Sequence, residues 1–143
     1  KIEDMFREID PEAIAAASLA QVHRAVLNSG EEVAIKLQYP ALRTQYGRDM
    51  TLIQILVRTG DWLLNLNGFN NIDFHAVVST FRKSLENELD FRKEVSNGLK
   101  ATRNFANHDD IYIPKYFSKY CSERVITMEF VRGVRINDAE AQK

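Results

Sequence analysis

The sequence predicts an α+β fold in which a small antiparallel sheet packs with two long helices. β-branched and polar residues alternate at 21–27 and again at 31–38, a period of two that is typical of strands. Apolar residues recur at helical spacing over 41–67 and over 72–105. The chain of 143 residues is long enough for one hydrophobic core, so we expect a single domain over residues 1–143.

The two alternating segments are predicted to form a β-hairpin. Residues 28–30, Asn-Ser-Gly, separate them, and Asn and Gly tolerate the positive φ angles of tight turns. Pro40 ends the second strand, because proline cannot donate a hydrogen bond within a sheet. The charged segment 1–9 is predicted to be a short helix that is closed by Asp10 and Pro11.

The helical segments contain expected interruptions. The first helix is expected to bend at Gly60, and the second is expected to kink near Asp90 or Gly98. Two more strands are predicted at 111–120 and 124–130, which brings the sheet to about four strands.

Charge and composition argue against several classes of function. Nineteen Lys and Arg residues against twenty Asp and Glu give a net charge of −1, so no basic field favours nucleic acid as a partner. Cys121 is the only cysteine, which excludes an internal disulfide and a thiolate metal cluster. The apolar stretch 51–66 contains Arg58 and Asp61 and is too polar for a bilayer span. No metal site is predicted from any group of residues.

Two motifs near the N-terminus point to nucleotide phosphates. Residues 14–22 have the spacing of the protein kinase glycine-rich loop, G-x-G-x-x-G-x-V, with alanine at all three glycine positions. Residues 33–36, Val-Ala-Ile-Lys, have the form of the strand whose lysine pairs with the phosphates. An alanine at positive φ is penalised by about 1–2 kcal/mol, so we expect this loop to hold a nucleotide differently from a glycine loop.

Lys36 requires a carboxylate partner from the following helix, because an unpaired lysine in a half-buried cleft is costly to desolvate. The candidates are Glu86, Glu88, Asp90 and Glu94. Asp90 and Glu94 lie at i and i+4, where two like charges favour a nearby cation. Glu88 and Glu94 are six residues apart, or about 120° around the helix axis, so these two carboxylates are predicted to have separate ionic roles.

The last strand ends in a segment that is suited to an adenine ring. In the kinase arrangement Met128 lies behind the adenine, and the main-chain groups of Glu129 and Val131 offer an acceptor and a donor to its edge.

These residues also have purely structural interpretations. Met128 can be an ordinary core residue. Residues 86–94 can form a solvated acidic face that pairs locally with Arg92 and Lys93. Ser18 has no neighbouring base that would make it a nucleophile, and we expect it to bond the loop backbone or a phosphate.

Four segments carry a resemblance to a known family: 11–25, 33–40, 88–94, and 127–130 with Gly133. In this order, and over nearly the whole chain, they resemble the UbiB family of atypical kinases, also called ADCK proteins. The resemblance implies a kinase-like N-lobe with an alanine-rich loop over the nucleotide.

The resemblance also implies roles for individual residues. Lys36 would be the phosphate-pairing lysine and Glu94 its helix partner. Glu88 and Asp90 match the ExD motif of the family, which engages an extension N-terminal to the lobe. The cofactor would be ATP or ADP with Mg, and the metal ligands would lie outside this chain. The nucleotide-binding residues would be Ala15, Ala16, Ala17, Ser18, Val22, Ala34, Lys36, Met128, Glu129 and Val131.

The family is associated with ubiquinone biosynthesis and with mitochondrial or plastid lipid metabolism, and its members act as ATPases or small-molecule kinases. The chain is therefore expected to be the ATP-binding lobe of such a protein. The expected location is the mitochondrial inner membrane in a eukaryote, and otherwise a plastid or bacterial membrane. A catalytically inactive module that senses nucleotide or binds lipid is the alternative.

The sequence departs from the pattern of a complete member of this family in three ways. It contains no KxGQ motif, no catalytic-loop His/Asp/Asn set and no D-F-G motif. We therefore expect the C-lobe and the KxGQ extension of a longer protein to be partners, together with the nucleotide and a lipid or quinone-pathway partner. The chain alone is not expected to turn over substrate.

Overall fold

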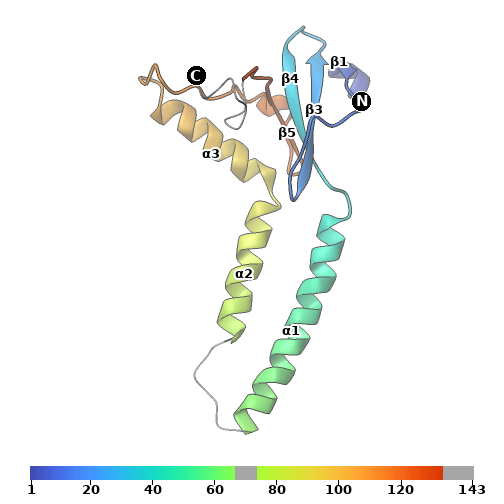
Figure 1. Ribbon diagram of the computed structural model, residues 1–143, viewed down its shortest axis with the longest axis vertical. Helices are drawn as coiled ribbons and strands as arrows, with labels where there is room; N and C mark the ends of the chain where they lie inside the picture. The colour runs from blue at the N-terminus through green and yellow to red at the C-terminus, as the bar shows by residue number, and fades with distance from the viewer. Residues whose placement is uncertain (67–73, 134–143) are drawn as a thin grey trace, which may run out of the picture.

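The computed structural model describes residues 1–66 and 74–133, and the described chain forms a five-stranded sheet and three α-helices (Figure 1). The strands are β1 (Phe6–Ile9), β2 (Ala15–Ala16), β3 (Ala20–Leu27), β4 (Glu32–Gln38) and β5 (Val125–Glu129). The helices are α1 (Leu42–Leu66), α2 (Phe74–Glu88) and α3 (Phe91–Asn104). The predicted α+β class is confirmed.

All strand pairs are antiparallel, in the order β1-β3-β4-β5, and β2 pairs with the same strand β3 as β1 does. The predicted hairpin is formed by β3 and β4, with Val22 opposite Lys36 and Arg24 opposite Ala34. Gly30 in its turn has a φ of +100°, a conformation that L side chains rarely adopt.

The two faces of the sheet bury different parts of the chain. One face carries a cluster of buried residues made by Ala25, Leu27, Val33 and Ile35, against which Phe6, Ile9, Leu37, Phe117, Tyr120 and Val125 pack. A second cluster joins the sheet to α3 and consists of Ala20, Ile126, Phe91 and Val95. The helix that carries Glu94 is therefore part of the core.

Two secondary-structure predictions were wrong. Residues 1–9 were expected to be helical, but only Ile2–Asp4 forms a 3-10 turn and Phe6–Ile9 pairs with β3. Phe6 and Ile9 bury their side chains against the sheet, which overrides the local charge pattern. Residues 111–120 were expected to be a strand, but they form a single bridge, between Tyr116 and Met128, followed by a 3-10 turn.

The expected second long helix is broken into α2 and α3 at Leu89 and Asp90, one of the two places where a kink was predicted. Gly98 lies inside α3 without ending it. Helices α1 and α2 lie side by side and extend away from the sheet, whereas α3 packs against β5 (Figure 1). None of the helices, over the described residues, is both long and apolar enough to cross a bilayer.

Gly98 leaves room for an aromatic ring, and this provides a test of how α3 is seated. A Cβ at Gly98 would lie 2.3 Å from Cε2 of Tyr116, so Gly98→Ala should force the ring or the helix to move and destabilise the protein by about 1–3 kcal/mol. Gly47→Ala in α1 is the matched control, because its Cβ would meet nothing within 4 Å and should stabilise the helix by about 0.5–1 kcal/mol. Urea unfolding measures both changes, and equal stability of the two variants would contradict this packing.

Candidate functional site

Lys36 and Glu94 form an ion pair that joins β4 to α3. The Lys36 Nζ donates hydrogen bonds to both carboxylate oxygens of Glu94, at 2.9 and 2.8 Å. The same ammonium group lies 5.0 Å from the centre of the Phe91 ring, a cation–π distance. The Lys36 side chain is 21% exposed and that of Glu94 is 44% exposed, so the pair lies at the surface of a cleft and not in the core. The pairing expected for these two residues is present in the structure.

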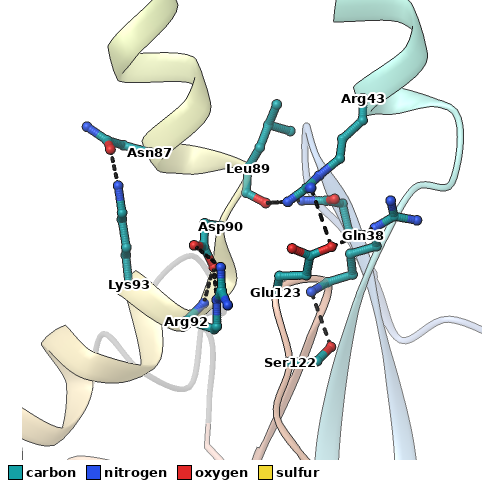
Figure 2. Close-up of polar contacts among 10 residues, drawn as sticks. Gln38, Arg43, Asn87, Leu89, Asp90, Arg92, Lys93, Ser122 and Glu123 are labelled. Carbon is teal, nitrogen blue, oxygen red and sulfur yellow. Dashed lines mark hydrogen bonds and ion pairs between the residues drawn. The ribbon is translucent and has the colours of Figure 1, made fainter.

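Helix α3 begins where it does because Asp90 caps it. Asp90 has extended backbone angles, φ −106° and ψ 94°, and its side chain accepts a hydrogen bond from the Arg92 backbone N–H at 3.1 Å. The Arg92 side chain also donates to both carboxylate oxygens of Asp90, at 2.9 and 2.8 Å (Figure 2). The hydrogen bonds from Arg92 hold the pKa of the Asp90 carboxyl at about 2. Asp90 is therefore an ionised cap in the folded protein at neutral pH.

The buried face of α3 decides where Glu94 points. Phe91 and Val95 are one helical turn apart, 2% and 7% exposed, and they pack against Ala20 and Ile126 of the sheet. Glu94 is adjacent to Val95 at the edge of this buried face, and its carboxylate reaches the neighbouring strand β4.

The strand registers place several predicted nucleotide-binding residues on one face of the sheet. Val22 is opposite Lys36, and Ala34, two residues before Lys36, is opposite Met128. Cross-strand partners and residues two apart share a face. Val22, Ala34, Lys36 and Met128 therefore share one face, and Ala15 is paired to Val22 at its edge.

The alanine loop has a conformation that alanine adopts freely. Ala15–Ala16 form β2, and Ala17 and Ala20 exchange backbone hydrogen bonds at 2.7 and 3.4 Å around a turn that contains Ser18. None of the described non-glycine residues has a positive φ. The expected penalty for alanine at positive φ therefore does not arise in this loop.

A cleft of about 880 Å³ lies between the loop, β4 and the start of α3. Its lining includes six of the predicted site residues: Ala17, Ser18, Lys36, Glu88, Asp90 and Glu94. The other predicted nucleotide-binding residues do not line this cleft: Ala15, Ala16, Val22, Ala34, Met128, Glu129 and Val131. Glu129 and Val131 lie at the end of β5 and just beyond it.

Glu88 and Asp90, the two ExD residues, belong to different elements. The predicted angle of about 120° between Glu88 and Glu94 therefore does not apply. Glu88 is the last residue of α2 and Asp90 is the cap of α3, so Glu88 and Glu94 are not related by the geometry of one helix. The alternative of local pairing is correct for Asp90, which binds Arg92. It is not correct for Lys93, which donates to the Asn87 side chain (Figure 2).

The side chain of Glu129 makes its hydrogen bonds on the other side of β5 from the cleft. It accepts hydrogen bonds from the Tyr112 hydroxyl at 2.6 Å and from the Lys115 backbone N–H at 3.1 Å, and the Tyr112 bond is the main cause of its lowered pKa. Beyond β5, Arg132 donates to both carboxylate oxygens of Glu32, at 3.1 and 2.9 Å. These contacts fix the backbone of the segment that was assigned to the adenine edge.

Three residues that contribute to the site were not predicted from the sequence. Phe91 lies under the Lys36 ammonium group, and its place beside Asp90 in the 88–94 segment is the signal that could have identified it. Tyr116 lines the cleft, where burial and then the charge of Glu94 raise its pKa. Gln38 donates to the backbone carbonyl of Leu89, two residues before α3 begins, and nothing in its sequence context indicates this contact.

The ABC1 atypical kinase-like domain matches residues 1–143 of the chain. The chain belongs to the ABC1 atypical kinase-like family. This ABC1 chain is 38% identical over 136 residues to the probable serine/threonine-protein kinase abkD of Dictyostelium discoideum, covering 95% of the chain and 19% of that protein. It is 34% identical over 139 residues to the probable protein kinase UbiB of Pseudomonas fluorescens, covering 96% of the chain and 26% of that protein.

The ABC1 fold is also similar to a solved structure. The complex of Rv3197 with erythromycin, from Mycobacterium tuberculosis, matches with a TM-score of 0.79 and 28% identity, over 94% of this chain and 32% of that one. The chain thus spans between about a fifth and a third of the length of these relatives. A further relative, from Arabidopsis thaliana, is described as chloroplastic, so the family includes plastid and bacterial members.

Asp90→Asn should remove an acid-sensitive part of the stability while retaining a cap. The folded pKa of about 2 lies below the value of about 3.9 for an unfolded aspartate. The stabilisation is therefore complete above pH ~4 and is lost as the pH falls toward 2. The wild type should melt at a higher temperature than Asp90→Asn at neutral pH, and this difference should shrink as the pH falls from ~4 toward 2.

The control for this experiment is Arg92→Gln. Arg92 is the main cause of the lowered pKa, so its loss should move the acid-sensitive range of Asp90 toward higher pH. A difference between wild type and Asp90→Asn that is constant from neutral pH to pH ~2 would show that the carboxylate is not held by Arg92.

Proposed function

We propose that this chain is the ATP-binding lobe of an atypical kinase or ATPase, in which Lys36 contacts the phosphates of ATP or ADP. The observation that carries the proposal is the Lys36–Glu94 ion pair at the wall of a cleft that also contains Ala17 and Ser18 of the alanine loop. A lysine that is oriented by a carboxylate from the neighbouring helix is the phosphate-binding arrangement of protein kinases. The family membership of the chain supports the same arrangement.

The arrangement of the cleft is chemically suited to a nucleotide. The ammonium group of Lys36 supplies a positive charge to phosphate oxygens, and Glu94 restricts the conformations of the lysine side chain before the ligand arrives. Val22, Ala34 and Met128 lie outside the lining of this cleft but share the face of the sheet that carries Lys36, and in the proposal the adenine ring lies against that face.

Mg would supply positive charge to the phosphate oxygens. Two of the three carboxylates that line the cleft already bind cations of this chain, Glu94 to Lys36 and Asp90 to Arg92, and are poorly suited to hold Mg. Within 1–66 and 74–133 no three His, Cys, Asp or Glu side chains are grouped as a metal site requires. The metal ligands in this proposal come from outside the described residues.

The wider function follows the resemblance to the UbiB relatives. In the proposal the lobe works with a C-lobe and with a KxGQ extension that meets Glu88 and Asp90 at the cleft. The complete protein acts in ubiquinone biosynthesis or mitochondrial lipid homeostasis, in contact with a lipid or quinone-pathway partner, at the mitochondrial inner membrane or at a plastid or bacterial membrane. The relatives named UbiB and the chloroplastic relative from Arabidopsis thaliana support this assignment.

Lys36→Met tests the phosphate contact. With Mg-ATP at about 100 times its Kd, the wild type should gain about 2.7 kcal/mol, or an increase in melting temperature of about 5–10 °C. Lys36→Met should lose most of this increase. The matched control is Lys100→Met, which removes an exposed lysine of the same helix that carries Glu94. Equal stabilisation of the Lys36→Met variant and the wild type would refute the role of Lys36.

A phosphate-release assay, run beside the thermal measurement, separates the active and inactive alternatives. In the full-length protein, stabilisation by nucleotide together with release of inorganic phosphate supports an ATPase or kinase. Stabilisation without phosphate release supports a module that senses nucleotide.

Ala17→Gly tests the loop. Glycine would give the turn between Ala17 and Ala20 access to positive φ, which no non-glycine residue of the described chain uses, and should change the ratio of the ATP and ADP affinities. Isothermal titration with each nucleotide measures the ratio. An unchanged ratio would show that the backbone restriction of the alanine loop does not select the nucleotide.

A further inference from the structure

Gln38 makes a contact that lies outside the nucleotide cleft. It is the last residue of β4, its side chain is 8% exposed, and its Nε2 donates a hydrogen bond to the backbone carbonyl of Leu89 at 3.0 Å (Figure 2). Leu89 lies between α2 and α3 and is followed directly by Asp90, the cap of α3. The hydrogen bond joins residues that are 51 positions apart in the sequence.

We propose that Gln38 is a positioning residue that holds α3 in the place where Glu94 meets Lys36. The proposal rests on the phosphate-binding role of Lys36 given above. Lys36 and Gln38 are two residues apart on β4 and share one face of the strand. Strand β4 is therefore attached to the α3 region at two points, through Glu94 and through the carbonyl of Leu89.

Two attachments fix the direction of α3 relative to β4, which a single ion pair does not. An ion pair between flexible side chains that are partly exposed tolerates a change in the direction of a helix and contributes about 0–1 kcal/mol. The hydrogen bond from Gln38 to Leu89 is buried and involves the backbone at the end of the helix, so it fixes the point at which α3 begins. With this end fixed, the first turn of α3 carries Glu94 to the Lys36 ammonium group.

The contacts around Leu89 support the same conclusion. Arg43, near the start of α1, donates to the same carbonyl at 3.3 Å and pairs with the Glu123 carboxylate at 3.4 Å (Figure 2). The Phe91 backbone N–H donates to the carbonyl of Glu123 at 3.1 Å. Leu89 and Phe91, on either side of the Asp90 cap, are thus both hydrogen-bonded to other elements. Of the two side chains that donate to Leu89, that of Gln38 is the buried one.

The experiment measures how fast Lys36 reacts with an amine-specific acetylating reagent, in the whole chain and without nucleotide. Quantification by mass spectrometry uses Lys100, exposed on α3, as the internal reference. In the wild type the ion pair should protect Lys36, and Glu94→Gln gives the rate of the unpaired lysine. Gln38→Met fills the same space without a donor and should raise the rate about fivefold, the factor expected for one net buried hydrogen bond.

Thr127→Val is the matched control. Thr127 is fully buried and its hydroxyl donates to the Tyr120 carbonyl at 2.9 Å, but it is opposite Ile35, on the other face of the sheet from Lys36. This variant should lose comparable stability and leave the Lys36 rate unchanged. If both variants raise the rate equally, Gln38 acts only through general stability and the proposal is overturned.

Two further outcomes decide the remaining cases. An unchanged Lys36 rate in folded Gln38→Met overturns the proposal. If Gln38→Met does not fold, Gln38→Asn keeps an amide but is one methylene shorter and should not reach the Leu89 carbonyl, and an unchanged rate in that variant overturns it as well. Because no nucleotide is present, a failure here differs from a failure of ATP binding, which appears as a missing thermal shift in the wild type.

Discussion

The burial of Phe91 and Val95 against Ala20 and Ile126 is the interaction on which the geometry of the site depends. Burying one large apolar side chain contributes about 1.5–3 kcal/mol, whereas an ion pair that is partly exposed, such as Lys36–Glu94, contributes about 0–1 kcal/mol. The ion pair is therefore too weak to place the helix. The apolar contact holds α3 against the sheet, the proposed role of the Gln38–Leu89 hydrogen bond is to fix where α3 begins, and the ion pair then restricts the direction of one ammonium group.

The alanine loop lies beside the Lys36–Glu94 pair without backbone strain. The loop begins as a strand, Ala15–Ala16, that pairs with β3, and the hairpin of β3 and β4 carries this pairing to Lys36. The position of the loop is set by sheet hydrogen bonds and not by unusual backbone angles. A methyl group at each position costs nothing in this conformation and reduces the freedom of the chain before a ligand binds.

The parts of the structure that follow from local patterns could be predicted from the sequence. The alternation of residues in β3 and β4 and the turn at Gly30 are local, and the ion pair of Lys36 followed from a motif that requires a carboxylate. The strand at residues 6–9 could not be predicted in this way, because its conformation comes from pairing with a distant strand.

The relative positions of Glu88 and Glu94 depend on the break between α2 and α3, which the sequence predicted only as a kink. Asp90 indicated that a kink was possible there, but a capping residue inside an amphipathic pattern does not say whether the helix bends or ends. The contact between Gln38 and Leu89 had no local signal, because it joins residues that are 51 positions apart. Contacts of this kind are decided by how the chain returns to the sheet after the two helices α1 and α2.

That return also explains how so much chain can separate Lys36 from Glu94, which are 58 positions apart. The entropic cost of closing a loop rises by only about 0.6 kcal/mol for each doubling of its length, so a long insertion between the two residues is inexpensive if its ends meet. The ends of the α1–α2 insertion meet where Gln38 binds the Leu89 carbonyl. Helices α1 and α2 can extend from the sheet, as Figure 1 shows, while the ion pair keeps the geometry of two adjacent elements.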